Sequence, residues 1–160
     1  MKYKLTSYFL SLFILLGCTQ ETANESNSSS SSEAQPVAMD LSIREAPAEA
    51  YVYFIAPLDG ETLSNPVKIV FGLSGLGIAP ALIDAPNTGH HHLLIDASLE
   101  NYELPIPADE NHVHFGLGQS ETTIELSPGE HNLQLVVGDL LHRPHNPPIM
   151  SDIITIEVIE

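Results

Sequence analysis

Between residues 50 and 160, apolar and polar side chains alternate in short runs, and turn residues separate one run from the next. The alternation is clean in Val67–Leu73 and Leu133–Val137, and it returns in Ile153–Val158. Successive side chains of a strand point to opposite faces, so a period of two gives a strand one apolar face, whereas a helix needs a period near 3.6. Because no helical periodicity competes with this pattern, we predict an all-β domain.

The same region holds enough β-type runs for a sandwich. Seven strands in about 110 residues, with a turn signal at roughly every tenth position, are typical of that architecture. We expect one immunoglobulin-like β-sandwich over residues 50–160. A cupredoxin-like sandwich is the alternative, and the pattern does not separate the two. The predicted strands are Tyr51–Ile55, Val67–Leu73, His90–Asp96, His112–Phe115, Thr122–Leu126, Leu133–Val137 and Ile153–Val158.

Residues 1–17 have the pattern of a bacterial secretory signal. Lys2 and Lys4 precede an apolar run, Tyr8–Leu16, that is too short for a membrane-spanning helix of about 20 residues. The chain then reaches Cys18 in a context that resembles the bacterial lipoprotein box, in which the cysteine is acylated and becomes the mature N-terminus. We therefore expect a signal peptide, a lipid anchor at Cys18 and a location in the bacterial cell envelope.

Residues 18–49 are predicted to be a linker. The stretch Ser26–Ser32 is almost entirely serine, and the acidic and proline residues around it offer little apolar area to bury. Ordering such a segment costs conformational entropy that no core offsets, so we expect a disordered tether. Thr19 stands where an aspartate would favour retention at the inner membrane. The expected location is therefore the outer membrane, facing the periplasm.

Composition limits the partners and the chemistry of the chain. The formal net charge is −16, and Lys68 and Arg143 are the only basic residues between 50 and 160, so no basic groove for nucleic acid can form. Cys18 is the only cysteine, which leaves no pair for an intramolecular disulfide. The segment Gly72–Gly75 lacks the Gly-x-Ser-x-Gly pattern of a hydrolase nucleophile. We do not expect an enzyme.

Histidine is the one residue type that indicates chemistry. All 8 histidines lie between residues 50 and 160. His90 and His92 share a face of their predicted strand, as do His112 and His114 of theirs, so pairing of these strands would bring four imidazoles together. The segment from 142 to 145 follows another predicted strand and could close over one end. Neutral imidazole nitrogens suit zinc or copper. The candidate metal ligands are His90, His92, His112, His114, His142 and His145.

Other residues add to this hypothesis or limit it. Asp96, Asp109 and Asp139 could accept hydrogen bonds from ligand rings and so orient them. Met150 could add a thioether ligand for copper. The Asp-x-Asp-x-Asp-Gly pattern of a calcium loop is absent from the sequence. His131, alone at the start of a strand, is interpreted as structural.

Several segments resemble an uncharacterised bacterial family, the domain of unknown function 4399. The most distinctive contain the Gly-His-His-His-Leu and His-x-His-Phe-Gly motifs, and the resemblance covers nearly all of residues 51–158. It implies an exported single domain in which these histidines belong to the family's motif, and it implies no particular activity. The segments are Val52–Gly60, Pro86–Asp96, Pro105–Asp109, His112–Gly116, Gly118–Thr122 and His142–Pro148.

Two functional hypotheses follow. In the first, the chain is an envelope lipoprotein whose histidine-rich sandwich binds copper or zinc. In the second, the domain is a non-catalytic immunoglobulin-like interaction module that docks an envelope partner, and its histidines are structural. Buried histidines that satisfy their hydrogen bonds would give the same sequence pattern, so the residues leave both open.

Overall fold

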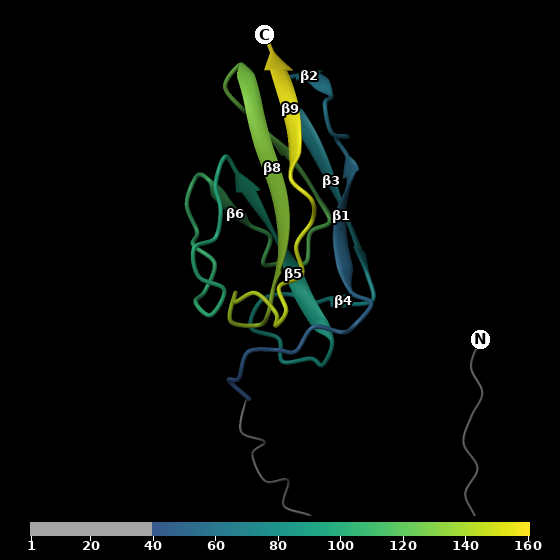
Figure 1. The fold of residues 1–160 in the computed structure, drawn as a ribbon, viewed down its shortest axis with the longest axis vertical. Coiled ribbons are helices and arrows are strands. Elements are labelled where there is room, and N and C mark those ends of the chain that lie inside the picture. Colours follow the sequence, from purple (N-terminus) through teal and green to yellow (C-terminus); the bar gives the residue numbers. More distant parts are fainter. Residues whose placement is uncertain (1–39) are drawn as a thin grey trace, which may run out of the picture. The chain divides into compact units, whose positions relative to one another are not determined.

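The structure, a computed structural model, describes residues 40–160 and consists of β-strands joined by turns and loops (Figure 1). The predicted signal peptide, Cys18 and the linker up to residue 39 lie outside the described residues. No helix from Asp40 onward is long and apolar enough to cross a membrane. The strands are β1 (Tyr51–Ala56), β2 (Thr62–Ser64), β3 (Val67–Ser74), β4 (Gly77–Ile78), β5 (Thr88–Ile95), β6 (His112–His114), β7 (Glu121–Ile124), β8 (Gly129–Gly138) and β9 (Ile154–Ile159).

The strands form two sheets, in the order β1-β3-β7 and β2-β9-β8-β5-β4, and β6 also pairs with β5. The seven predicted strands correspond to β1, β3 and β5 to β9. In chain order, the first, second and fifth of them form the small sheet, while the third, sixth and seventh lie together in the large one. That division is the one found in immunoglobulin-like sandwiches. The predicted all-β sandwich is therefore confirmed, and its topology is immunoglobulin-like.

Three differences from the predicted strands concern the sheet edges and ends. β2 and β4 were not predicted, because two or three residues that pair along an edge carry no periodic signal. β8 begins at Gly129, four positions before the predicted start. Its pairing with β9 continues through Glu130 and His131, whose partners are Glu157 and Ile156.

The main core lies between the two sheets. The small sheet contributes Val52, Ile69 and Phe71, each at most 3% exposed. In the large sheet, every second residue of three neighbouring strands faces the same core, as the period-two pattern requires. These residues are Leu93 and Ile95 of β5, Leu133, Leu135 and Val137 of β8, and Ile154, Ile156 and Val158 of β9.

The outer face of the large sheet is also covered, by the loops between β5 and β6 and between β8 and β9. Leu94 of β5 and Val136 of β8 form a second apolar cluster there with Ile106 of the first loop, and Met150 of the second loop packs against it. Both faces of β5 are consequently buried, and seven of its eight residues are inaccessible to solvent. Polar side chains on this strand therefore lie in a low-dielectric interior whichever face they occupy.

The segment just before β1 packs on the domain. Asn146 donates its backbone N–H to Arg44 O and accepts from the N–H of Ala46, at 2.9 Å in both cases. Ala46 and Ala50 pack against the main core. The linker predicted up to residue 49 therefore ends in a stretch that contacts the domain, because its few apolar residues find a place on the sandwich.

One glycine of β5 tests how tightly the two faces are packed. A Cβ added to Gly89 would lie 2.6 Å from Val137 Cγ1 and 2.7 Å from Gly138 O, whereas one added to Gly77 of β4 would approach no atom more closely than Thr88 Cγ2, at 3.3 Å. We expect Gly89→Ala to lower the free energy of unfolding by about 1–3 kcal/mol and Gly77→Ala to change it by about 0.5 kcal/mol or less. Urea denaturation measures both; equal midpoints for the two variants would contradict this packing.

Candidate metal centre

The cluster begins with the histidine triplet of β5. Because neighbours in a strand point to opposite faces, His91 enters the main core beside Phe71, while His90 and His92 turn to the outer face of the large sheet. The two outer rings touch: Nε2 of His90 and Nε2 of His92 are 3.1 Å apart, so that one N–H donates to the other nitrogen. Both residues are 1% exposed.

The two other rings come from β6 and from the loop after β8. The pairing of β5 with β6 places His114 opposite His92, on the same face. His142 reaches the same place from the loop. The ring-centroid distances are 5.0 Å for His92–His114, 4.9 Å for His90–His92, 5.0 Å for His90–His114, 5.1 Å for His90–His142, 6.1 Å for His92–His142 and 4.6 Å for His114–His142. We call His90, His92, His114 and His142 the four-histidine cluster.

Two ring nitrogens of this cluster lack the partners that buried polar atoms normally have. One ring nitrogen each of His90, His114 and His142 lies within 4.8 Å of the other two. Nδ1 of His92 and Nε2 of His114 are buried without a hydrogen-bond partner. Such atoms are rare in folded proteins, and an ion or water that binds there would remove the deficit. The arrangement is thus able to hold a metal ion.

Burial keeps His90, His92 and His114 neutral, which is the form that binds metal. Loss of solvation, together with repulsion from the neighbouring imidazoles, lowers the pKa of His90 to about 4 and that of His92 to about 2. Burial and the nearby His142 also lower the pKa of His114. At neutral pH these nitrogens therefore carry lone pairs rather than a second proton.

Two glycines make room for the rings. A Cβ at Gly138, which pairs with His90, would lie 2.8 Å from Nε2 of His92, and a Cβ at Gly116 would lie 2.3 Å from Cε1 of His114. Neither glycine was singled out in the sequence. The sequence signal that could have found them is a glycine that shares a face with a histidine. Gly138 pairs with His90 across the sheet, and Gly116 follows His114 by two residues.

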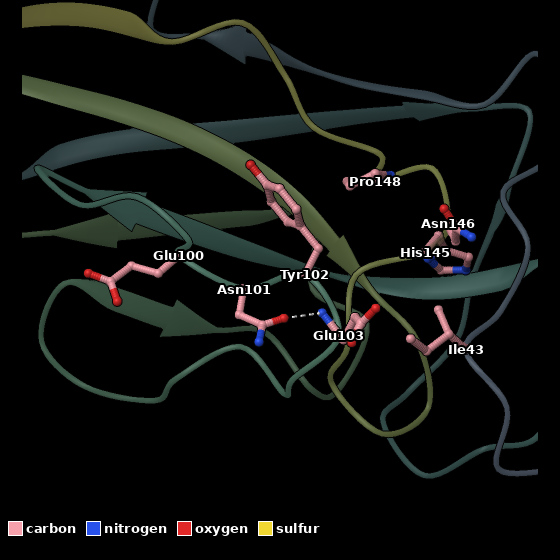
Figure 2. A pocket seen from close by; sticks show the side chains of 8 residues that line it. All are labelled: Ile43, Glu100, Asn101, Tyr102, Glu103, His145, Asn146 and Pro148. Atoms are coloured by element: carbon pink, nitrogen blue, oxygen red, sulfur yellow. Dashed lines mark hydrogen bonds between the residues drawn. The ribbon is translucent and has the colours of Figure 1, made fainter.

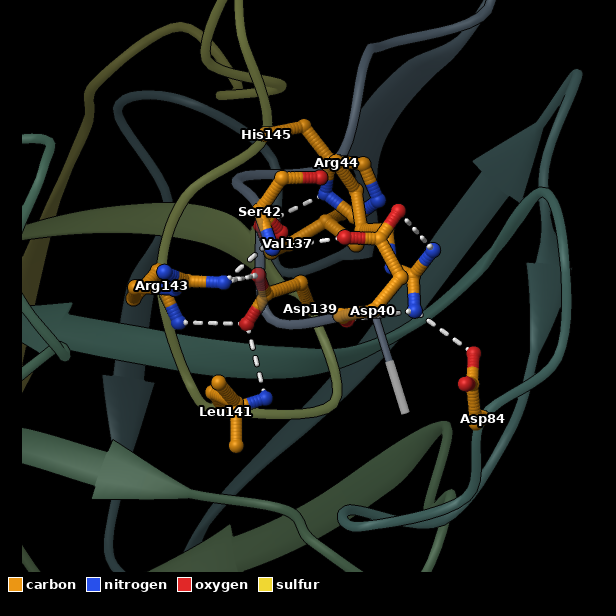
Figure 3. Close-up of polar contacts among 9 residues, drawn as sticks. All are labelled: Asp40, Ser42, Arg44, Asp84, Val137, Asp139, Leu141, Arg143 and His145. Carbon is orange, nitrogen blue, oxygen red and sulfur yellow. Dashed lines mark hydrogen bonds and ion pairs between the residues drawn. The ribbon is translucent and has the colours of Figure 1, made fainter. Parts of the chain in front are cut away.

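The loop that carries His142 is held by a buried carboxylate. Asp139, which is fully buried, accepts backbone N–H groups from Leu141 at 2.7 Å and from Arg143 at 2.9 Å, and it also pairs with the Arg143 guanidinium (Figure 3). His142 has a φ of 67°, in the left-handed region that residues other than Gly, Asn and Asp seldom occupy. Its carbonyl accepts from Ile106 N–H at 2.8 Å. The strain at His142 is thus supported from both loops.

His112 and His145, also predicted as ligands, lie outside the cluster. His112 is two residues from His114 on the same face, but its Nδ1 donates to Asp109 Oδ1 at 2.8 Å. His145 lies against Gly89. Gly89 is the neighbour of His90 in β5 and therefore faces the opposite side of the strand, so His145 lies on the side away from the cluster. Its Nδ1 faces Val137 O at 3.4 Å, and it lines a pocket of about 400 Å³ with Ile43, Glu100, Asn101, Tyr102, Glu103, Asn146 and Pro148 (Figure 2).

The remaining polar candidates serve local structure. His131 has both ring nitrogens on acceptors, Nδ1 at 2.7 Å from Asp96 Oδ2 and Nε2 at 2.8 Å from Ser127 O. Burial opposes its charge, but these acceptors outweigh burial and raise its pKa. Of the three predicted aspartates, Asp96 and Asp109 do orient histidines, yet not those of the cluster. Met150 packs with the outer apolar cluster.

The lowered pKa values predict how the metal-free protein responds to acid. Below about pH 6.5 the unfolded chain takes up protons on residues 90 and 92 that the folded chain, with pKa values near 4 and 2, does not bind. Their contribution to stability is complete above pH 6.5 and is lost as pH falls, at about 1.4 kcal/mol per pH unit for each histidine. Urea unfolding at pH 7, 6 and 5 with chelator present measures this loss; a flat profile would contradict neutral burial.

Comparison with known proteins identifies the family. The model of the family described as Domain of unknown function (DUF4399) matches residues 69–159. No curated protein matches the chain. Among solved structures, the fibronectin(III)-like modules of Clostridium thermocellum CbhA match with a TM-score of 0.35 and 10% identity, over 75% of this chain and 48% of that one, so this chain spans about half of its length. The family match contains β5, β6, β8 and β9 with the whole four-histidine cluster, and the chain belongs to the family DUF4399.

Proposed function

We propose that this domain binds one zinc or copper ion through the four-histidine cluster and acts without catalysis, as a metal-binding protein of the cell envelope. One observation carries the proposal: four imidazoles from three separate segments meet under two loops with ring centroids 4.6–6.1 Å apart. Imidazole nitrogen is the ligand that zinc and copper accept most readily in proteins.

Two histidines outside the cluster, His112 and His131, support this reading over a structural one, while His91 on the opposite face of β5 shares the unpartnered state with one buried ring nitrogen. His112 and His131 each hydrogen-bond a carboxylate and so show how structural histidines are satisfied here. In the cluster, by contrast, the described residues provide one ring-to-ring hydrogen bond, while Nδ1 of His92 and Nε2 of His114 have no partner. Burying Nε2 of His114 without a partner costs about 1–3 kcal/mol, which coordination of an ion by that nitrogen would offset.

Metal titration of the purified protein, made without a histidine tag, tests the proposal. We expect about one Zn²⁺ or Cu²⁺ per chain, and thermal stability that rises with ion concentration by RT ln(1 + [L]/Kd), or about 2.7 kcal/mol at 100 times Kd. His142→Asn, which retains the left-handed backbone, and His114→Asn should each weaken binding by about 100-fold or more. Isothermal titration calorimetry measures the affinities.

His112→Asn is the matched control. It alters the same strand, two residues from His114, but leaves the cluster intact, and its affinity should equal that of the wild type within about twofold. No binding of either ion by folded wild-type protein would sink the proposal. The immunoglobulin-like interaction module with structural histidines would then be the better account.

We further propose that Cys18 is acylated and anchors the domain at the outer membrane, facing the periplasm. The sequence supports this anchor. Lys2 and Lys4 precede the apolar run Tyr8–Leu16, and Gly17 and then Cys18 follow that run directly. The domain would then bind its ion close to the membrane surface without crossing the bilayer.

Replacement of the lipid-accepting cysteine tests this anchor. In the wild type we expect the protein in the membrane fraction of a bacterial host, because several acyl chains on one residue give lasting attachment. The Cys18→Ala variant should appear in the soluble fraction or remain an uncleaved precursor. It should also lack the mass that acylation adds. The same fractionation for both proteins, with no acyl mass on the wild type, would exclude the anchor.

A further inference from the structure

The four rings are arranged as the corners of a tetrahedron. Four ligands around a square have two diagonals about 1.4 times as long as the edges, whereas all six separations are equal in a tetrahedron. In the four-histidine cluster five of the six centroid distances lie between 4.6 and 5.1 Å, and the sixth, His92–His142, is 6.1 Å. The distance opposite it, His90–His114, is 5.0 Å. A square would require both of these to be long.

The size of the cluster also matches a tetrahedral ion. With metal–nitrogen bonds of about 2.0–2.1 Å, tetrahedral zinc holds its ligand nitrogens about 3.3 Å apart and the imidazole centroids about 5 Å apart. Nε2 of His90 and Nε2 of His92 are already 3.1 Å apart. The nitrogens of His90, His114 and His142 lie within 4.8 Å of one another, and His92 is not part of that three-residue group. Tetrahedral coordination therefore requires these three nitrogens to approach one another by up to about 1.5 Å and the ring of His92 to turn toward them.

The surroundings oppose a change to a square. His90 and His92 are fixed on one strand, and His114 is fixed on its neighbour by the register of β5 and β6. The ring of His92 lies over Gly138, and the ring of His114 lies over Gly116. A Cβ on either glycine would be closer to the ring than van der Waals contact allows. Close-packed interiors resist such rearrangements. The cluster therefore imposes its geometry on the ion.

The donor set points in the same direction. Among the described residues, the group able to hold a metal ion contains only histidines, and Met150 packs in the outer apolar cluster with Leu94 and Val136. Soft sulfur ligands, which select Cu⁺, are thus missing from the set, while Cu²⁺ favours a tetragonal arrangement. Four protein ligands leave no position open for water, as in zinc sites that hold the ion without reacting it.

We propose that the site is a closed, four-imidazole tetrahedral zinc site that disfavours Cu²⁺ by its shape. This inference rests on the proposed metal-binding function and names the ion. His92 is the fourth ligand, and its hydrogen bond to His90 in the metal-free protein gives way to coordination when zinc binds. Zinc sites of this kind hold or hand over the ion, and the chain's acidic surface attracts cations toward it.

Cobalt and copper distinguish the geometries in the purified wild-type protein. Co²⁺, a spectroscopic substitute for zinc, should give the intense visible absorption of tetrahedral coordination. Unconstrained nitrogen ligands bind Cu²⁺ more tightly than Zn²⁺. We expect the ratio of Cu²⁺ to Zn²⁺ affinity to be at least about 10-fold smaller here than for a free hexahistidine peptide measured in the same buffer.

Variants identify the fourth ligand. His92→Asn should weaken zinc binding and change the cobalt spectrum in position, intensity and pH dependence, because a water molecule then takes the fourth position in place of an imidazole. His112→Asn should leave both unchanged. Should His92→Asn fail to fold, the wild-type cobalt spectrum still decides between four ligands and more.

The possible failures differ in meaning. If no ion binds, the proposed metal-binding function itself is wrong. If ions bind but Cu²⁺ shows a tetragonal electron paramagnetic resonance spectrum and the full preference of the peptide, metal binding stands and the tetrahedral zinc site is wrong. A weakly absorbing, six-coordinate cobalt spectrum would likewise overturn the closed site.

Discussion

The register of β5 between its neighbours is the constraint on which the rest of the domain depends. This strand pairs with β8 on one side and with β6 on the other, so that His92 lies across from Val136 and from His114 at once. A shift of one residue would turn Leu93 and Ile95 out of the main core and move His91 into the place of its neighbours. The core and the cluster thus fix the same register, and each specifies the other.

That register places polar imidazole rings in the interior of the domain. The imidazoles of His90 and His92 are buried, and this burial lowers their pKa values even though the charge of Asp139 acts in the opposite direction on His90. Elsewhere in the same domain, His131 and His112 have carboxylate partners. Nε2 of His91, on the opposite face of β5, is also buried without a partner. The unpaired ring nitrogens thus lie on β5 and on its neighbour β6, whereas the histidines paired with carboxylates lie nearer the surface.

Much of this could be predicted from the sequence, and the limits have physical causes. Period-two alternation predicted the seven main strands and the strand faces of His90, His92 and His114, since the side-chain direction of a strand follows from its geometry. It did not separate His142 from His145, which are three residues apart in a loop without a period. The role of Asp139 was also missed, because its contacts with Arg143 depend on the closed turn.

His112 shows a different limit. It occupies the face that its spacing predicts. Its ring nevertheless bonds to Asp109, with 2.8 Å between His112 Nδ1 and Asp109 Oδ1, and does not join the cluster. A strand pattern predicts the face of a residue but not the rotamer of its side chain, and a local carboxylate decides the latter. Cluster membership therefore required the tertiary structure.

The segment that leads into β1 gives the cluster a mechanical connection. Ser42 O accepts from the Arg143 guanidinium at 2.9 Å, and Arg44 O accepts from Asn146. Both contacts are made just after His142, by Arg143 and Asn146 of the loop that presents it. A pulling force that arrives along the backbone at Asp40 would thus load this loop before it reached any strand of the sandwich, and the ring of His142 would be the first of the four to be displaced.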